Sequence, residues 1–230
     1  LDASGAATIT AADVDNGSND NCSIVSLSVT PSSFACANVG ANTVTLTVTD
    51  QSGNSDDCSA TVTVQDTVPP MAVCQDVTVE LDSTGNASIT AADVDGGSSD
   101  ACGIASLSVS PNSFACGDVG GNTVTLTVTD VNGNTSSCTA TATVEDNIAP
   151  RAVCQDITVQ LDNSGNASIT GADIDGGSSD NCGIDSLVAS PSSFTCAELG
   201  ANAVTLTVTD VNGNSSTCTA NVTVDYTVAP

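Results

Sequence analysis

Hydrophobic and polar residues alternate along several short segments, most regularly at 122–129, where valine or leucine alternates with threonine. The same alternation occurs at 76–81 and 104–109. A period of two predicts strands that are buried on one face and exposed on the other. A short strand is expected at 87–90 and a returning strand at 138–144, and no segment has the periodicity of a helix.

Turn-forming residues separate these segments. Asn132-Gly133-Asn134 is a strong β-hairpin signal, and 92–100 is a loop dense in Asp, Gly and Ser. Phe114 supplies the aromatic side chain that we expect to fill the core. Six or seven short strands within about 80 residues favour a β-sandwich.

The whole pattern occurs three times at a spacing of 80 residues, which indicates an array of one repeated domain. Segment 123–130 (TVTLTVTD) is identical to 43–50 and nearly identical to 203–210. We therefore expect three domains, at residues 1–70, 71–150 and 151–230. Segments that end in proline mark the domain boundaries, at 64–70, 144–150 and 224–230. Proline restricts the backbone, so these linkers are predicted to be short and semi-rigid.

The first domain has no counterpart of the ten residues 71–80 and therefore lacks its opening strand. The open sheet edge that results would accept a strand from a neighbouring chain. Cropping of a longer polypeptide explains the missing strand equally well.

The charge is strongly one-sided, with 27 acidic residues against one basic residue, Arg151, and a formal net charge of -26. Such a chain repels phosphate backbones and anionic lipid surfaces, so nucleic-acid binding and direct membrane insertion are disfavoured. Many of the acidic residues are Asp at fixed repeat positions without cationic partners. A bound hard cation is the natural compensation.

The eleven cysteines also follow the repeat. They occupy the positions Cys22, Cys102 and Cys182; Cys36, Cys116 and Cys196; Cys58, Cys138 and Cys218; and Cys74 and Cys154. A twelfth position would fall just before Leu1, so we expect a partner outside this sequence rather than a functional free thiol.

No C-x-x-C pair and no histidine is present, which disfavours zinc. Two disulfides per domain and an oxidising, extracellular compartment are expected. With no initiator Met, signal peptide or transmembrane run, the chain is expected to be part of a longer secreted or cell-surface protein.

The segment Pro69 to Val79 (PPMAVCQDVTV) resembles the opening of hyalin (HYR) repeats, with their proline pair, cysteine and D-[IV]-x-V strand. The later segments DNCGI at 180–184, VGGNTV at 119–124 and VTD at 128–130 follow the order of the same family. The resemblance implies immunoglobulin-like sandwiches of extracellular proteins, including very large bacterial adhesins, without catalytic residues. The expected fold is all-β, with three tandem immunoglobulin-like β-sandwich domains in a linear array. Cys116, the Asp-rich loop and the near absence of basic residues depart from the family pattern.

The immunoglobulin-like topology suggests which cysteines pair. The first and last strands of such a sandwich begin at the same end, so Cys74 is expected to bond with Cys138. Cys102 and Cys116 bracket a hairpin and would then bond with each other. The equivalent pairs are Cys154–Cys218, Cys182–Cys196 and Cys22–Cys36, with Cys58 left alone. Other pairings of the four cysteines in each repeat remain open. The short and long links would stabilise the fold by about 3 and about 4 kcal/mol.

The most specific chemical motif is Asp93-Val94-Asp95 followed by Asp100. Calcium prefers six to eight oxygen ligands, and D-x-D-x-G spacing can direct alternate carboxylates to one ion. The sequence therefore predicts calcium ligands at Asp93, Asp95 and Asp100, at Asp13, Asp15 and Asp20, and at Asp173, Asp175 and Asp180. The alternative is a solvated loop whose Asp and Ser side chains close their own turns.

Topology places this loop, and the hairpin from Asp130 to Asn134, at the end of each sandwich that faces the preceding domain. There the linkers bring Asp66 and Asp146, so calcium is expected to brace the joints between domains. The segment Asp146 to Pro150 resembles the joints of cadherin arrays, in which calcium has this role. Asp225-Tyr226 departs from this register, which predicts a weaker last joint.

An enzyme is not expected, because without histidine, lysine or a free thiolate most general-base and nucleophile pairs cannot be built. Paired Asp residues could serve a glycosidase, but these lie in repeated loops without aromatic sugar platforms. Two hypotheses remain. The first is an extracellular structural protein, a calcium-stiffened and disulfide-stabilised bacterial stalk or filament that contacts its own repeats or copies. The second is an adhesin whose loops bind a surface glycan or protein; the near-identity of the repeats favours the first.

Overall fold

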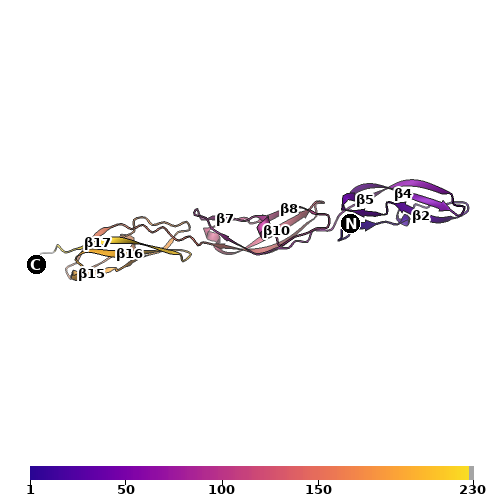
Figure 1. Ribbon diagram of the computed structural model, residues 1–230. Helices are drawn as coiled ribbons and strands as arrows, with labels where there is room; N and C mark the ends of the chain where they lie inside the picture. The colour runs from indigo at the N-terminus through magenta and orange to yellow at the C-terminus, as the bar shows by residue number, and fades with distance from the viewer. Residues whose placement is uncertain (228–230) are drawn as a thin grey trace. The chain divides into compact units, whose positions relative to one another are not determined.

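The computed structural model describes residues 1–227 and confirms an all-β fold in which one order of elements occurs three times (Figure 1). Residues 228–230, the end of the third expected boundary segment, lie outside the described residues. Close contacts divide the chain into two compact units. The first comprises 1–75, 90–110 and 124–140; the second comprises 76–89, 111–123 and the chain from 141 onward. The expected domain limits at 70 and 150 therefore stay a prediction.

The third repeat has the complete set of strands, including the opening strand that the first repeat lacks. Its elements are β12 (Ile157–Gln160), β13 (Asn166–Ser168), η3 (Gly171–Asp173), β14 (Ile184–Ser190), β15 (Ser193–Thr195), η4 (Cys196–Glu198), β16 (Gly200–Asp210) and β17 (Ser215–Asp225). One sheet has the order β12-β17-β16-β14, and a smaller sheet pairs β13 with β15. Figure 1 shows β16 and β17 side by side.

Alternation in the sequence explains this sheet. Val204, Leu206 and Val208 in β16 are fully buried, whereas the residues between them are partly or fully exposed. The strands β14, β16 and β17 are antiparallel, and β12 joins the edge of β17 in parallel. Phe194 in β15 is 1% exposed and packs into the same core, which brings the small sheet onto the large one. The core position expected for the phenylalanine of each repeat is confirmed.

The second repeat has the same elements. They are β6 (Val77–Glu80), β7 (Asn86–Ser88), α2 (Ala91–Val94), β8 (Ile104–Ser110), β9 (Ser113–Ala115), η2 (Cys116–Asp118), β10 (Gly120–Asp130) and β11 (Thr135–Glu145). The large sheet has the order β6-β11-β10-β8. The Asp-rich segment after β7 begins with the single helical turn α2 rather than with a loop. The alternation pattern gave no sign of this turn because four residues are too short to show a helical period.

The first repeat lacks the opening strand, as expected from its sequence. Its elements are β1 (Ala6–Thr8), α1 (Ala11–Val14), β2 (Ile24–Thr30), β3 (Ser33–Ala35), η1 (Cys36–Asn38), β4 (Gly40–Asp50) and β5 (Ser55–Val64). The large sheet is reduced to β2-β4-β5. Without the strand that β12 supplies in the third repeat, Val62 is only half-buried, whereas its counterpart Val222 is fully buried.

Four disulfides cross-link the chain, and two of them are the expected links from the first strand to the last, Cys74–Cys138 and Cys154–Cys218. The other two differ from expectation. Cys36 bonds with Cys102, and Cys116 bonds with Cys182, each across 66 positions and from one repeat to the next. The expected pairs Cys22–Cys36, Cys102–Cys116 and Cys182–Cys196 are therefore wrong, and Cys22, Cys58 and Cys196 are free and exposed.

The third repeat shows why the hairpin pairs do not form. Cys182 precedes β14, whose seven residues extend over about 23 Å. The chain then returns through β15, which has only three residues, before it reaches Cys196. The two cysteines therefore remain near opposite ends of the sandwich, too far apart for the 4.4–6.8 Å Cα separation that a disulfide usually has.

Candidate metal centre at the junctions between repeats

The first aspartate of each D-x-D motif closes a helical turn. Asp93 Oδ2 accepts hydrogen bonds from Thr90 N at 2.7 Å and from Thr90 Oγ1 at 2.7 Å, which forms a capping box around α2. These hydrogen bonds, the side-chain one first, hold the pKa of Asp93 below its ordinary value because they stabilise the ionised form. Asp13 and Asp173 bind Thr10 and Thr170 in the same way.

The second aspartate of the motif closes the following turn. Asp95 Oδ1 accepts the Ser98 N–H at 2.9 Å, and hydrogen bonds from Ser98 lower the pKa of Asp95. Asp15 and Asp175 form the same turn with Ser18 and Ser178. The first two aspartates of each motif thus follow the alternative of self-closed turns, and neither lies in the carboxylate groups described below. A metal role for these six residues stays a prediction.

The third aspartate lies where two repeats meet. Asp180 Oδ2 accepts the N–H groups of Cys182 at 2.8 Å and Gly183 at 3.1 Å, which fixes the loop before β14. Asp100 holds Cys102 and Gly103 in the same way. The first junction is defined here as linker 64–70 with the facing loop and hairpin of the second repeat. The second junction is linker 144–150 with the corresponding parts of the third repeat.

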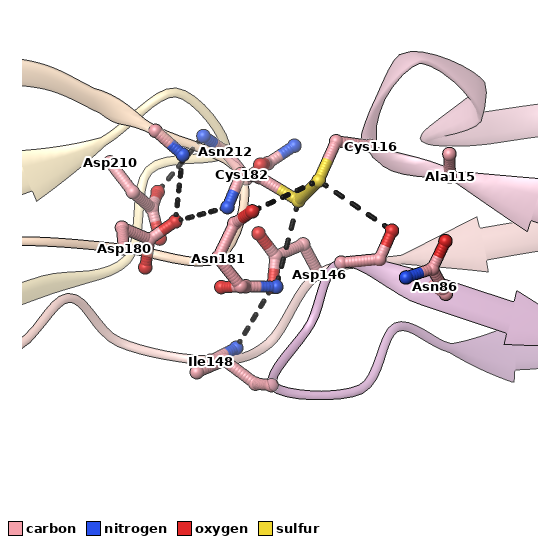
Figure 2. Close-up of a disulfide and its surroundings, with 12 residues drawn as sticks. Asn86, Ala115, Cys116, Asp146, Ile148, Asp180, Asn181, Cys182, Asp210 and Asn212 are labelled. Carbon is pink, nitrogen blue, oxygen red and sulfur yellow. Dashed lines mark hydrogen bonds between the residues drawn. A yellow bond between two sulfur atoms is a disulfide. The ribbon is translucent and has the colours of Figure 1, made fainter.

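Three carboxylates converge at the second junction. Asp146 from the linker, Asp180 from the loop and Asp210 from the end of β16 each offer an oxygen, and these oxygens lie within 4.8 Å of one another (Figure 2). Asp146 is 6% exposed and Asp210 is 1% exposed. Three buried or half-buried like charges repel one another unless a cation or protons compensate them.

Several buried oxygens at this junction have no hydrogen-bond partner among the described residues. They are Asp146 Oδ2, Asp180 Oδ1, Asn181 Oδ1 and Asn212 Oδ1. A buried acceptor without a partner costs about 1–3 kcal/mol, and more when it is charged. All four are acceptors, so a cation or a donor such as water satisfies them, and a further protein acceptor does not. Asn181 and Asn212 were not among the sequence-predicted ligands.

Direct hydrogen bonds also cross the second junction. Asn181 Nδ2 donates to Asp146 Oδ1 at 3.2 Å and to Asp82 O at 3.3 Å. Asn214 Nδ2 donates to Asp146 O at 2.9 Å, and Ser216 Oγ donates to Pro150 O. The Cys116–Cys182 disulfide lies beside them, with Cys116 Sγ 3.4 Å from Asn181 O (Figure 2). The carboxylates are therefore held by a cross-linked frame.

The first junction has the same frame but fewer ligand oxygens. Asp66, which is 9% exposed, meets Asp100 as the sequence predicted, and the third member of the group is Cys102. Its sulfur is bonded to Cys36 and cannot act as a thiolate ligand. Ala101 stands where the second junction has Asn181. Asn134 Nδ2 still donates to Asp66 O at 3.1 Å, and Ser136 Oγ donates to Pro70 O at 2.6 Å.

Asp210 belongs to the second group but lies outside the D-x-D motif and was not a predicted ligand. Its signal was present, because it ends the most regular strand of the repeat and precedes the hairpin residues Asn212-Gly213-Asn214. Its Oδ1 accepts the N–H groups of Asn212 at 2.9 Å and Asn214 at 2.8 Å. Asp20, the counterpart of Asp180 in the first repeat, is exposed and lies in neither group.

Across residues 1–227, no helix is long and apolar enough to cross a membrane.

Among known protein families, the HYR domain matches residues 4–64 of this chain. No curated protein matches the chain. Similar solved structures include protocadherin gamma B7 extracellular cadherin domains 1–4, with 13% identity, a TM-score of 0.35, and coverage of 84% of this chain and 59% of that chain. Human mucin-like protocadherin EC1–2 has 13% identity, a TM-score of 0.37, and coverage of 69% and 98%. Titin domains I67–I69 have 11% identity, a TM-score of 0.37, and coverage of 92% and 84%. The chain thus spans less than two thirds of the protocadherin gamma B7 chain.

Proposed function

We propose that this chain of HYR-like immunoglobulin-fold repeats is an extracellular structural protein, a disulfide-stabilised stalk or filament of a bacterial surface whose second junction is stiffened by calcium. The observation that carries the proposal is the group of three carboxylates with unpaired buried oxygens at that junction. The four disulfides are those of a protein in an oxidising compartment, which supports a location outside the cell.

Charge is the first argument for a bound cation. The sequence has no lysine and no histidine, so Arg151 is the only basic side chain. That single charge cannot balance the three carboxylates Asp146, Asp180 and Asp210, so further compensation by a bound cation is favoured. Carboxylate and amide oxygens are hard ligands, which calcium and magnesium prefer. Zinc and copper are more often bound by imidazole nitrogen or thiolate sulfur.

The number of protein oxygens favours calcium over magnesium, which usually keeps several waters and binds only one or two carboxylates. Oxygens within 4.8 Å of one another can all reach a single ion at the 2.3–2.6 Å typical of calcium, since ligands on opposite sides are then about 4.6–5.2 Å apart. Magnesium needs about 2.0–2.1 Å and near-octahedral order. The unpaired amide oxygens Asn181 Oδ1 and Asn212 Oδ1 provide additional neutral ligands beside the carboxylates.

Binding there would couple two repeats. Asp146 belongs to the linker, whereas Asp180 and Asp210 belong to the loop and the hairpin of the third repeat. An ion that needs all three binds the docked junction better than the separated one, and it stabilises docking by RT ln(1 + [Ca²⁺]/Kd). The group at the first junction contains only two carboxylates, Asp66 and Asp100, so it is expected to bind calcium more weakly.

The local structure gives less support to an adhesin that uses the same loops. Asp93 and Asp95 are engaged in their own turns, and Asp100 and Asp180 hold junction cysteines. These side chains stabilise loop conformation and are not free to bind a glycan. A structural role is compatible with these fixed loop conformations, because it needs no free side chain on the loops.

The proposal is tested by thermal unfolding and terbium luminescence of the oxidised protein in calcium, in magnesium and in excess EGTA. Calcium should raise the unfolding midpoint, and EGTA should reverse the rise. The double variant Asp146→Asn/Asp180→Asn should lose most of the response. The matched first-junction variant Asp66→Asn/Asp100→Asn should keep most of it. An unfolding midpoint of the unaltered protein that is the same in calcium and EGTA would overturn the calcium site.

A further inference from the structure

The Cys116–Cys182 disulfide and the carboxylate group of the second junction share one loop. Asp180 and Asn181 come directly before Cys182. Two of the buried oxygens without a partner, Asp180 Oδ1 and Asn181 Oδ1, belong to these two residues. We infer that this disulfide regulates the calcium affinity of the site: the oxidised bond holds the loop in place for the ion, and reduction weakens binding. This regulation requires the calcium site of the proposed function.

The disulfide fixes one carboxylate through the backbone. Asp180 Oδ2 accepts the N–H groups of Cys182 at 2.8 Å and Gly183 at 3.1 Å. Cys182 is itself held by its bond to Cys116. The position of the Asp180 carboxylate therefore depends on a cysteine that reduction would release.

The same bond holds Asn181. Cys116 Sγ lies 3.4 Å from Asn181 O, and Asn181 Nδ2 lies 3.6 Å from Cys182 Sγ (Figure 2). The amide also donates to the linker carboxylate, with 3.2 Å from Nδ2 to Asp146 Oδ1. A Cβ on Gly85 would come within 2.6 Å of Cys116 Sγ and 3.0 Å of Asn181 O, so this part of the junction is closely packed. Both sulfurs thus contact the residue that joins the linker to the loop.

The order that the disulfide imposes determines the sign of the effect. An ion bound by the linker, the loop and the hairpin must order all three, and this ordering lowers the net affinity. The disulfide confines the loop before the ion binds and so removes part of that cost. In the reduced protein only a fraction of the molecules has the group assembled, and the apparent Kd rises by the inverse of that fraction. Oxidised protein should therefore bind calcium more tightly.

The coupling is reciprocal. If oxidation raises the calcium affinity by some factor, calcium raises the equilibrium constant for disulfide formation by the same factor. Coupling between two sites is typically roughly 5- to 150-fold. We expect about tenfold, near the lower end of that range, because the polypeptide linker still joins the repeats after reduction. A tenfold change corresponds to about 30 mV in the reduction potential of a two-electron couple.

The first junction provides a matched bond in the same molecule. Cys36–Cys102 also spans 66 positions, and all four cysteines of the two bonds are half-buried. Its group holds only two carboxylates, and among residues 1–227 none of the buried side-chain oxygens without a partner lies there. A small reductant should therefore reach both bonds alike, whereas calcium should protect mainly Cys116–Cys182.

Reduction of the bond is a two-electron step. Dithiothreitol gives two electrons and two protons to Cys116–Cys182, which becomes two thiols. The reagent is itself oxidised to a cyclic disulfide, through a mixed disulfide with one of the cysteines.

The first test measures the disulfides. It uses the full chain with Cys22→Ser/Cys58→Ser/Cys196→Ser, which removes the exposed free thiols and prevents exchange with them. This protein is equilibrated in mixtures of reduced and oxidised dithiothreitol, in calcium and in EGTA. The thiols are then alkylated, and peptide mass spectrometry gives the reduced fraction of each bond. Calcium should raise by about tenfold the ratio of reduced to oxidised reagent at which half of Cys116–Cys182 is reduced. The shift for Cys36–Cys102 should be smaller.

The second test measures calcium affinity by titration calorimetry. Cys116→Ser/Cys182→Ser should bind calcium about tenfold more weakly than the oxidised, unaltered protein. The control Cys36→Ser/Cys102→Ser should keep its affinity for the second junction. Circular dichroism establishes that each variant is folded.

The outcomes separate the regulation from the calcium site itself. Equal affinity of the unaltered protein and folded Cys116→Ser/Cys182→Ser would overturn the regulation and leave the site intact. Equal protection of the two disulfides by calcium would overturn it as well, because the effect would then be general stabilisation. If the oxidised, unaltered protein binds no calcium, the proposed site is wrong and the regulation is wrong with it.

Discussion

Asn181 Nδ2 lies 3.2 Å from Asp146 Oδ1, so an amide in the loop of the third repeat donates a hydrogen bond to the linker carboxylate. The same amide group also donates to Asp82 O, at 3.3 Å. Asp146 Oδ2 and Asn181 Oδ1 remain without hydrogen-bond partners within residues 1–227. One side chain therefore joins the linker to the facing loop and leaves two oxygens for a further ligand.

Replacement of this side chain should weaken the second junction. In Asn181→Ala we expect a loss of about 1–3 kcal/mol in the free energy of unfolding, because two hydrogen bonds of about 0.5–1.5 kcal/mol each are removed. Calcium affinity should also fall. Ala101→Asn restores the equivalent donor at the first junction and should stabilise it. Urea unfolding and calcium titration of both variants measure these effects. If Asn181→Ala and the unaltered protein are equally stable, Asn181 does not stabilise the second junction.

Removal of a disulfide between repeats should uncouple them. In Cys116→Ser/Cys182→Ser, loss of a link across 66 positions is expected to cost about 4 kcal/mol. Calorimetry should also show an additional unfolding transition, because the repeats are no longer covalently joined at this point. The matched variant Cys74→Ser/Cys138→Ser removes a link across 64 positions within one repeat. It should lower stability by a similar amount without the extra transition.

Gly85 should tolerate no side chain. It has φ +74°, and an added Cβ would lie 2.6 Å from Cys116 Sγ and 3.0 Å from Asn181 O. Gly133 has φ +90° and no heavy atom within 4 Å of an added Cβ. Gly133→Ala should cost only the backbone strain, about 1–2 kcal/mol. Gly85→Ala should cost about 1–3 kcal/mol more through overpacking and should reduce the yield of the Cys116–Cys182 bond, measured by peptide mapping.

The turn carboxylates should make the protein sensitive to acid. Hydrogen bonds from Thr84, first from its side chain and then from its N–H, lower the pKa of Asp82. Since the pKa in the folded state is below that in the unfolded state, ionised Asp82 stabilises the fold above about pH 4. This contribution is lost as the pH falls through the lowered value.

Asp82→Ala should therefore have a lower urea midpoint than the unaltered protein at pH 7, and the difference should shrink as the pH falls below about 4. Asp185 is exposed, lies in β14 and caps no turn. The control Asp185→Ala should change the midpoint little at either pH. A difference for Asp82→Ala that persists in acid would mean that packing, rather than ionisation, is responsible.

The strands and the core could be predicted because alternation is a local signal. Val204, Leu206 and Val208 alternate with less buried residues in the sequence, and their burial follows. The junction disulfides could not be predicted in this way. Since Cys36 and Cys116 are the same position in successive repeats, spacing cannot show which of them bonds with Cys102. The pairing depends on which end of the sandwich each cysteine occupies.

The candidate site was predictable in part. Asp146 and Asp180 were expected at the junction, and they meet there. Asp93 lies three residues after Thr90, which is also the spacing of a capping box, and the D-x-D spacing cannot separate that role from metal binding. The hairpin was expected at the junction, but Asp210 was not taken as a ligand because an Asp at this place also closes the hairpin turn, as its hydrogen bonds to Asn212 and Asn214 show.

The junction disulfides change how a mechanical load passes through the chain. One covalent path follows 1–36, crosses to Cys102, follows 102–116, and crosses to Cys182. A second path follows 1–74, crosses to Cys138, follows 138–154, and crosses to Cys218. Each path bypasses most of the chain, so the bypassed segments are hidden length under tension. Reduction of the junction bonds alone leaves the second path intact, and the hidden length is released in full only when all four bonds are reduced. The extensibility of the protein is thus set by the redox state of four bonds.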